Sequence, residues 1–320
     1  MNHTPILILA GNAGSGKDTV ADILVKRFGA QKIAQADPLK RFCKKLCGFS
    51  DDQLWGPSAS RNAPDARLVD ERKRGNGLAL FELAASCDTV DKSHSGYDPG
   101  GLYDNWPWVS EWLKDLGLDE SARKPLSAWA FDITADPKAV TPRYFLQSLG
   151  SWGRELDPDV WINAALKSAR RVLAGNASYL RDEGVFYAPG VFWPLAVITD
   201  GRYQNEILAV RMVGGAAYLI SRPDQTLGAA AEAAGIKGHS SEAELGCIPP
   251  HFYDVLISND GTLDQLDELI RNLGAEFGYR EALSAQGMWN YLHGVRDSQG
   301  HASWYRSPRY MKDLLKPGDP

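Results

Sequence analysis

Residues 6–19 of the 320-residue chain read ILILAGNAGSGKDT. The apolar run Ile6–Ala10 has the continuous pattern of a strand that is buried on both faces, as in a parallel sheet. Residues Gly11–Lys17 match the pattern G-x-x-x-x-G-K, and apolar residues at helical spacing follow over Thr19–Phe28. A strand, a glycine-rich turn and a helix in this order predict a phosphate-binding loop.

The residue types of this loop suit a chain of phosphates. Glycines allow successive backbone N–H groups to point at one anion, and the N-terminus of the following helix adds a partial positive charge. Lys17 adds a full charge on a mobile stem for the outer phosphates of ATP. We therefore expect ATP to contact the loop through Asn12, Ala13, Gly14, Ser15, Gly16, Lys17, Asp18 and Thr19.

Asp18 stands where such loops usually carry Ser or Thr, and Thr19 follows it. An acidic side chain here either contacts Mg²⁺, directly or through water, or complements the positive end of the helix dipole. Thr19 either contacts a phosphate or caps the helix locally. The sequence leaves both pairs of alternatives open.

Strands and helices alternate along most of the remaining chain, which predicts an α/β fold with a mainly parallel sheet. Together with the loop, this favours the three-layer P-loop NTPase fold. Further strands are expected over residues 31–35, 195–199, 216–220 and 254–258. Further helices are expected from Pro38, from Pro142, and over residues 159–173, 205–213 and 263–273.

Two regions lack this alternation. Residues 50–140 carry scattered Pro, Gly and Asp and a cluster of tryptophans, with short helices expected at 77–87 and 107–116. We interpret this region as a helical insertion or lid rather than a second core. Residues 275–320 form an aromatic-rich C-terminal extension, so the predicted organisation is one P-loop domain over residues 1–274, followed by this extension.

Composition excludes several classes of protein. The chain is 44% hydrophobic and 23% charged, which is ordinary for a globular protein. A net charge of −5 argues against a general nucleic-acid binder. No run of about 18 apolar residues and no secretion signal are present, so we expect a cytoplasmic protein without a membrane partner. The scattered cysteines are expected to be reduced thiols: Cys43, Cys47, Cys87 and Cys247.

Asp200 follows a predicted buried strand, at the sheet edge where open α/β proteins bind ligands. A carboxylate in this place is typical of residues that hold Mg²⁺ or its waters. Arg202 and Glu206 follow on the next loop and helix. The alternative is a helix-capping aspartate with a surface ion pair beside it.

Several blocks in the same order resemble the deoxynucleoside monophosphate kinases of tailed bacteriophages. The loop ending GKDT is typical of that family, and Arg143 and Gln147 fit its R-x-x-x-Q-x-x-G helix. Asp200, Arg202 and Glu206 fit its D-x-R-x-x-x-E strand end. The resemblance spans residues 5–273 and is completed by residues 37–40, Trp161, residues 222–223, 239–242 and 257–262.

The resemblance implies transfer of a phosphoryl group from ATP to a deoxynucleoside 5′-monophosphate, with Mg²⁺. It implies catalytic roles for Lys17, Asp200 and Arg202, and an ATP contact for Arg222. The implied metal site comprises Asp18, Thr19 and Asp200. The implied substrate site comprises Asp37, Leu39, Lys40, Arg143, Gln147, Gly150, Trp161, Arg202 and Glu206.

Two other functions remain open. The acceptor is instead a hydroxymethylated pyrimidine within phage DNA, for which the basic and aromatic tail would provide stacking and phosphate contacts. Alternatively, the chain is a non-catalytic ATP-binding module. The tryptophans and the tail aromatics otherwise pack against the core or against a second copy in a homodimer.

Overall fold

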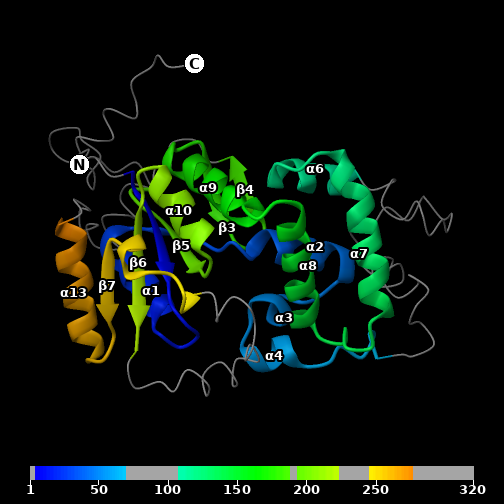
Figure 1. The fold of residues 1–320 in the computed structure, drawn as a ribbon, viewed down its shortest axis with the longest axis horizontal. Coiled ribbons are helices and arrows are strands. Elements are labelled where there is room, and N and C mark those ends of the chain that lie inside the picture. The colour runs from blue at the N-terminus through cyan, green and yellow to red at the C-terminus, as the bar shows by residue number, and fades with distance from the viewer. Residues whose placement is uncertain (1–3, 70–106, 188–192, 223–244, 277–320) are drawn as a thin grey trace, which may run out of the picture.

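The computed structural model describes residues 4–69, 107–187, 193–222 and 245–276. Two parts lie side by side in Figure 1, one built on a sheet and one made of helices. The helix expected at 77–87, the segment 239–242 and the tail from residue 277 lie outside the described residues, as does Cys87. No helix of the described residues is long and apolar enough to cross a membrane.

The sheet has five strands in the order β2-β5-β1-β6-β7, and every pairing between them is parallel. This confirms the predicted α/β fold with a parallel sheet. The strands are β1 (Ile6–Ala10), β2 (Gln31–Ile33), β5 (Ala196–Gly201), β6 (Ala216–Ser221) and β7 (Val255–Ser258). A separate antiparallel hairpin, which the sequence analysis did not predict, consists of β3 (Ala177–Leu180) and β4 (Gly184–Tyr187).

Helices cover both faces of the sheet. One face carries α1 (Lys17–Phe28) and α13 (Leu263–Glu276), and the other carries α9 (Val160–Leu173) and α10 (Gln204–Met212). The strand β1 lies at the centre, and its five side chains are fully buried. Successive side chains of a strand point to opposite faces, so Leu7 packs toward α1 whereas Ile8 packs toward α9.

The helical part has a hydrophobic core of its own. Phe42 and Trp112 lie 4.3 Å apart between ring centroids, and Trp129 and Leu126 pack in the same cluster. The part consists of α2 (Asp37–Cys47), α3 (Asp51–Trp55), α4 (Ser58–Asn62), α6 (Pro107–Leu116), a 3₁₀ turn (Glu120–Ala122), α7 (Arg123–Ala135) and α8 (Pro142–Leu156). The region that the sequence suggested as an insertion or lid rather than a second core contributes Leu54, Leu113 and Trp129 to this cluster, which it shares with α2, α8 and α9.

Several element boundaries differ from the expected ones, and two of the differences lie beside the glycine-rich loop and Asp200. The strand β2 ends at Ile33 rather than at Gln35, because the backbone N–H of Gln35 donates to the Asp200 carboxylate instead of to a neighbouring strand. The helix α1 begins at Lys17, two residues before the expected start, and Gly16 precedes it in the left-handed conformation (φ 99°). A short 3₁₀ turn (Pro250–Phe252) leads into β7.

The packing of α8 on α9 requires a glycine at residue 153. A Cβ atom there would lie 2.8 Å from Cε2 of Trp161 and closer still to Cζ2. We expect Gly153→Ala to lower the free energy of unfolding by about 1–2 kcal/mol, because the overpacking cost exceeds the gain in helix propensity. Urea unfolding measures this. The control is Ser151→Ala, at an exposed position of the same helix, and equal effects of the two substitutions would contradict the prediction.

Candidate functional site

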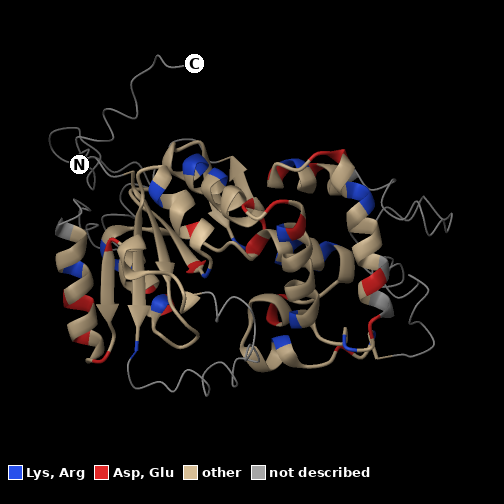
Figure 2. Ribbon diagram, in the orientation of Figure 1, with Lys and Arg blue, Asp and Glu red and all other residues tan. Residues whose placement is uncertain are grey.

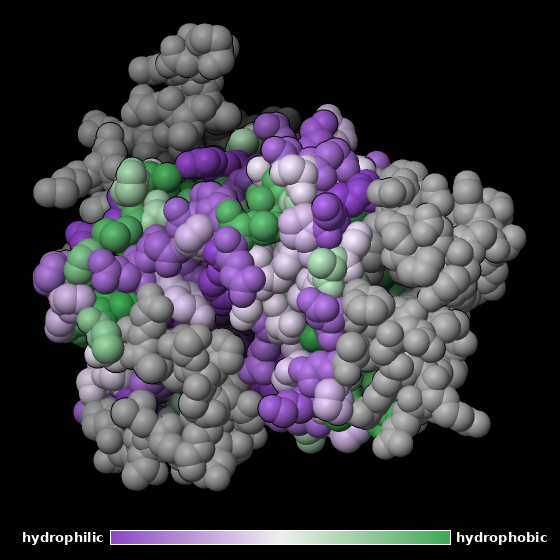
Figure 3. All heavy atoms as spheres, turned by 45° about the vertical axis from the view of Figure 1, so that its right-hand side comes forward, coloured by the Kyte–Doolittle hydropathy of each residue, from purple (hydrophilic) through white to green (hydrophobic). Residues whose placement is uncertain are grey.

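A cleft of about 500 Å³ lies between the carboxyl ends of β2 and β5 and the helical part. Figure 3 shows predominantly hydrophilic residues along the boundary of the two parts. The glycine-rich loop and α1 form one wall, and α2, α4 and α8 form the other. The cleft is lined by Ala13, Gly14, Lys17, Asp18, Ala34, Gln35, Ala36, Leu39, Lys40, Ser58, Arg61, Arg143, Leu146, Gln147, Gly150, Arg154, Trp161, Thr199, Asp200, Arg202, Tyr203 and Glu206.

Asn259, which follows β7, supports the glycine-rich loop through a hydrogen bond. The side-chain amide Nδ2 of Asn259 donates to the backbone oxygen of Ser15 over 2.9 Å. A Cβ atom at Gly16 would lie 3.3 Å from Cγ of Asn259 and closer still to Nδ2. With the positive φ of Gly16, this contact restricts the residue to glycine.

The loop presents the N-terminus of α1 to the cleft. Lys17 is 8% exposed and lines the cleft, and its Nζ donates to the backbone oxygen of Asn12 over 3.4 Å. Asp18 also lines the cleft, whereas Thr19 does not. The first N–H groups of a helix have no partner within the helix, so this end of α1 suits an anion.

Asp200 is the last residue but one of β5 and is half-buried. Its Oδ1 accepts from the backbone N–H of Gln35 over 2.9 Å, and its Oδ2 accepts from that of Ala36 over 3.3 Å. Burial and the charge of Asp37 raise the pKa of this carboxyl, and the bond from Gln35 and the charges of neighbouring cations oppose that rise. Asp200 therefore fastens the β2–α2 connection to β5 while it lines the cleft.

The carboxylate of Glu206 fixes the turn after β5 through hydrogen bonds to its backbone. Its Oε2 accepts from the backbone N–H groups of Arg202 over 2.8 Å and of Tyr203 over 3.1 Å. Burial raises the pKa of Glu206 to about 7, although these two bonds favour the ionised form. These bonds occupy the carboxyl of Glu206. They favour a role in orienting Arg202 over direct contact with substrate.

The cleft carries six basic and three acidic side chains among its lining residues. Figure 2 shows basic positions along α8 and charges of both signs at the end of β5. Desolvation, together with the nearby positive charges of Arg61 and Arg202, lowers the pKa of Arg143 to about 10. Cations gathered and partly desolvated in this way favour an anionic ligand. The six are Lys17, Lys40, Arg61, Arg143, Arg154 and Arg202.

The cleft brings together most of the residues that the sequence singled out. They are Ala13, Gly14, Lys17, Asp18, Leu39, Lys40, Arg143, Gln147, Gly150, Trp161, Asp200, Arg202 and Glu206. Outside the lining are Asn12, Ser15, Gly16, Thr19, Asp37 and Arg222. Asn12, Ser15 and Gly16 belong to the glycine-rich loop and shape its backbone. Arg222 is exposed and follows β6, next to residues outside the described part.

Two of the predicted substrate residues, Asp37 and Trp161, are buried and hydrogen-bonded within the fold. Asp37 is buried and accepts from Tyr179 Oη over 2.6 Å and from Trp55 Nε1 over 2.9 Å, so its carboxylate ties α2 to β3 and α3. Trp161 is 3% exposed and donates from Nε1 to the backbone oxygen of Gly150 over 3.0 Å. It borders the cleft from within the hydrophobic core.

Two arginines of the lining were missed. Arg154 is seven residues after Gln147 and four after Gly150, so helical spacing from Arg143 onward was a usable signal for it. Its guanidinium lies 4.5 Å from the ring centroid of Tyr203. Arg61 carried no such signal, because it belongs to the weakly patterned region after residue 50.

Comparison with known proteins gives one partial similarity. No family model matches the chain. A stretch of 59 residues is 44% identical to the "Putative deoxynucleotide monophosphate kinase" of Acanthamoeba polyphaga mimivirus. The match covers 18% of this chain and 31% of the viral protein, so the chain spans about a third of the length of the curated relative that it matches. It relates part of this chain to part of a nucleotide kinase.

The raised pKa of Glu206 predicts a pH dependence of stability. Between about pH 4.5 and 7 the folded chain holds a proton on Glu206 that the unfolded chain has released, so rising pH destabilises the fold. The loss is at most about 3 kcal/mol and is complete above pH 7. Glu206→Gln stays neutral and is expected to lack this loss.

Denaturant unfolding at pH 5 and pH 8 measures the effect. The stability of Glu206→Gln relative to the unsubstituted chain should rise between these two pH values. Glu155→Gln on the exposed side of α8 serves as the control and should not change with pH relative to the unsubstituted chain. A parallel pH dependence of Glu206→Gln and the unsubstituted chain would show that the carboxyl ionises normally in the fold.

Proposed function

We propose that the chain is a P-loop nucleotide kinase that transfers the γ-phosphoryl group of ATP to the 5′-phosphate of a deoxynucleoside monophosphate. The observation that supports this most is a single cleft with a glycine-rich loop on one wall and basic side chains on the other. Transfer between two phosphates requires such an arrangement, because donor and acceptor both bring negative charge to one place. The name of the viral relative supports the same class of reaction.

The donor site is proposed at the glycine-rich loop. The backbone N–H groups at the start of α1 and the ammonium of Lys17 would hold the outer phosphates of ATP. Ser15 has a buried Oγ with no hydrogen-bond partner among the described residues, so the loop retains unused polar capacity. The hydrogen bond from Asn259 to the backbone oxygen of Ser15 stabilises the loop.

The acceptor site is proposed on the opposite wall. Arg143, Lys40 and Arg202 would neutralise the monophosphate, since guanidinium groups match phosphate oxygens in pairs. Leu39 and Gln147 lie beside them, and they offer an apolar contact and an amide for the base. In the reaction, an acceptor phosphate oxygen bonds to the γ-phosphorus as the bond to the β–γ bridging oxygen breaks, and ADP leaves with the electron pair.

The residues present fit a magnesium ion held through water. Asp18 and Asp200 both line the cleft, and oxygen ligands suit Mg²⁺. Both oxygens of Asp200 already accept backbone N–H groups, which leaves their other lone pairs for waters of the ion. Mg²⁺ would neutralise charge on the phosphates that Lys17 also contacts. Thr19, outside the lining, is a weaker candidate ligand.

A screen of acceptors tests the proposed activity. The chain is incubated with Mg²⁺ and ATP and with each of the four deoxynucleoside monophosphates, their ribose forms and modified-pyrimidine monophosphates. We expect acceptor-dependent ADP release with at least one deoxynucleotide, together with formation of the matching diphosphate. Absence of turnover with every acceptor would rule out the proposal, and activity on hydroxymethylated DNA alone would favour the DNA kinase.

Lys17 provides a test of the donor site. Lys17→Ala is expected to lower kcat by about 100-fold or more, because a charge that stabilises the transferred group is lost. Lys26→Ala changes an exposed lysine of the same helix and should leave kcat unchanged. Circular dichroism establishes that both variants fold. Wild-type activity in Lys17→Ala would show that the loop is not the donor site.

A further inference from the structure

The helices α3 and α4 form a hairpin at the edge of the helical part, and α4 packs on α8. The hairpin presents two polar side chains to the cleft, Ser58 and Arg61. Neither belongs to the blocks that suggested a nucleotide kinase. The sequence around them contains no recognisable motif.

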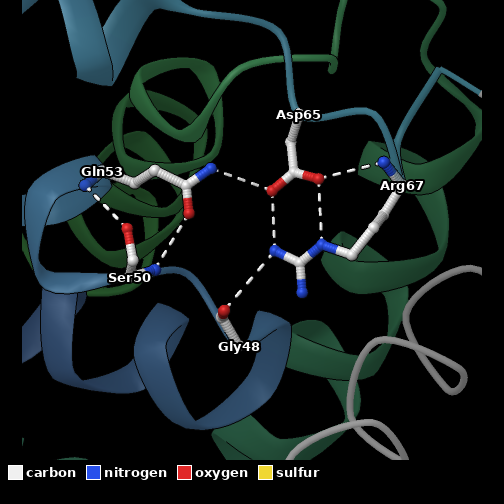
Figure 4. A network of polar contacts seen from close by, with 5 residues as sticks. All are labelled: Gly48, Ser50, Gln53, Asp65 and Arg67. Carbon is white, nitrogen blue, oxygen red and sulfur yellow. Dashed lines mark hydrogen bonds and ion pairs between the residues drawn. The ribbon is translucent and has the colours of Figure 1, made fainter.

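A network of polar contacts fixes this hairpin (Figure 4). Asp65 accepts from Gln53 Nε2 over 2.9 Å and from Arg67 Nε over 2.9 Å, and Gln53 in turn caps α3 together with Ser50. The guanidinium of Arg67 holds the pKa of Asp65 at about 2. The backbone N–H of Asp65 donates to the oxygen of Val140, just before α8. The hairpin is thus held in fixed register with α8.

Ser58 links two arginines across the two elements. Its Oγ accepts from Nη2 of Arg61 over 3.4 Å and from Nη2 of Arg143 over 3.5 Å. One hydroxyl therefore brings a guanidinium from α4 and one from α8 to the same place. Two like charges repel each other, so this pairing is unfavourable unless an anion lies between them.

Each of these guanidinium groups has unused hydrogen-bond capacity. The Nε atoms of Arg61 and Arg143 are buried, and neither has a hydrogen-bond partner among the described residues. A buried donor without a partner costs about 1–3 kcal/mol, more when the group is charged. Desolvation lowers the pKa of Arg61, and Asp18 on the opposite wall is the nearby carboxylate that opposes this.

We infer that Arg61 is a further binding residue for the acceptor phosphate, and that it acts as a pair with Arg143 which Ser58 holds at the right spacing. The inference rests on the proposed function and adds a residue to its acceptor site. Two guanidinium forks from different elements match the three terminal oxygens of a phosphate monoester. Asp18 lies across the cleft, so this pair faces the donor loop, where the acceptor phosphate must be for transfer.

The test compares Arg61→Gln with the unsubstituted chain. The acceptor KM, or the Kd of the monophosphate for the ATP-free chain, should rise about 10- to 100-fold, because a charge-assisted bond is lost. The KM for ATP should stay within about twofold, since the donor wall is unchanged. Arg61→Lys should recover part of the affinity, because it keeps the charge without the fork. Arg271→Gln, an exposed arginine on α13, is the control.

A second measurement separates phosphate binding from a structural role. The nucleoside without its phosphate should bind Arg61→Gln and the unsubstituted chain equally. Equal loss of affinity for nucleoside and monophosphate, or a rise in the KM for ATP as large as that for the acceptor, would overturn the inference. An acceptor KM that does not change in Arg61→Gln, with turnover in the unsubstituted chain, would overturn it while the proposed kinase activity stands.

The two proposals can also be separated if the unsubstituted chain shows no kinase activity. If the unsubstituted chain transfers to no acceptor, the proposed function falls, and titration of the ATP-free chain with deoxythymidine monophosphate and with inorganic phosphate decides on Arg61. Weaker binding of both probes by Arg61→Gln supports an anion site at the arginine pair. Equal binding, or no binding by the unsubstituted chain, overturns it.

Discussion

The bonds from the backbone N–H groups of Gln35 and Ala36 to the Asp200 carboxylate join the two parts of the molecule. They end β2 and set the direction in which α2 leaves the sheet. Asp37, the first residue of α2, continues the connection through Tyr179 and Trp55. These two carboxylates hold the start of the helical part beside the carboxyl ends of the strands, where the cleft lies. Asp200 therefore combines a structural task with a place in the site.

The charged groups of the cleft differ in their hydrogen-bond partners. The carboxylates of Asp200 and Glu206 accept backbone N–H groups, whereas arginines of α4 and α8 have buried Nε donors without a hydrogen-bond partner among the described residues. Asp200 and Glu206 hold the backbone, and Arg143 and Arg61 face the space between the walls. An anion in the cleft could thus be bound by Nε donors of Arg61 and Arg143 that have no hydrogen-bond partner among the described residues.

The sequence predicted what depends on neighbours along the chain. The apolar run of β1, the turn before Lys17 and the strand end at Asp200 are local patterns, and the sheet they imply is the one observed. It did not predict the partners that the fold brings together over long separations. Ser58 meets Arg143 across 85 residues, and Asp37 meets Tyr179 across 142. The core around Trp129 likewise brings together apolar residues of α2, α6, α7 and α8, which lie far apart in the chain.

The bond between Asn259 and Ser15 spans 244 residues. The glycine-rich loop thus receives support from a residue that directly follows the last described strand, β7. Contacts of such high sequence separation form late, because the loop they close must be ordered first. During translation, the emerging glycine-rich turn remains without this support until β7 has left the ribosome. A nascent chain therefore acquires the observed shape of its glycine-rich loop only after all five strands of the sheet have been made.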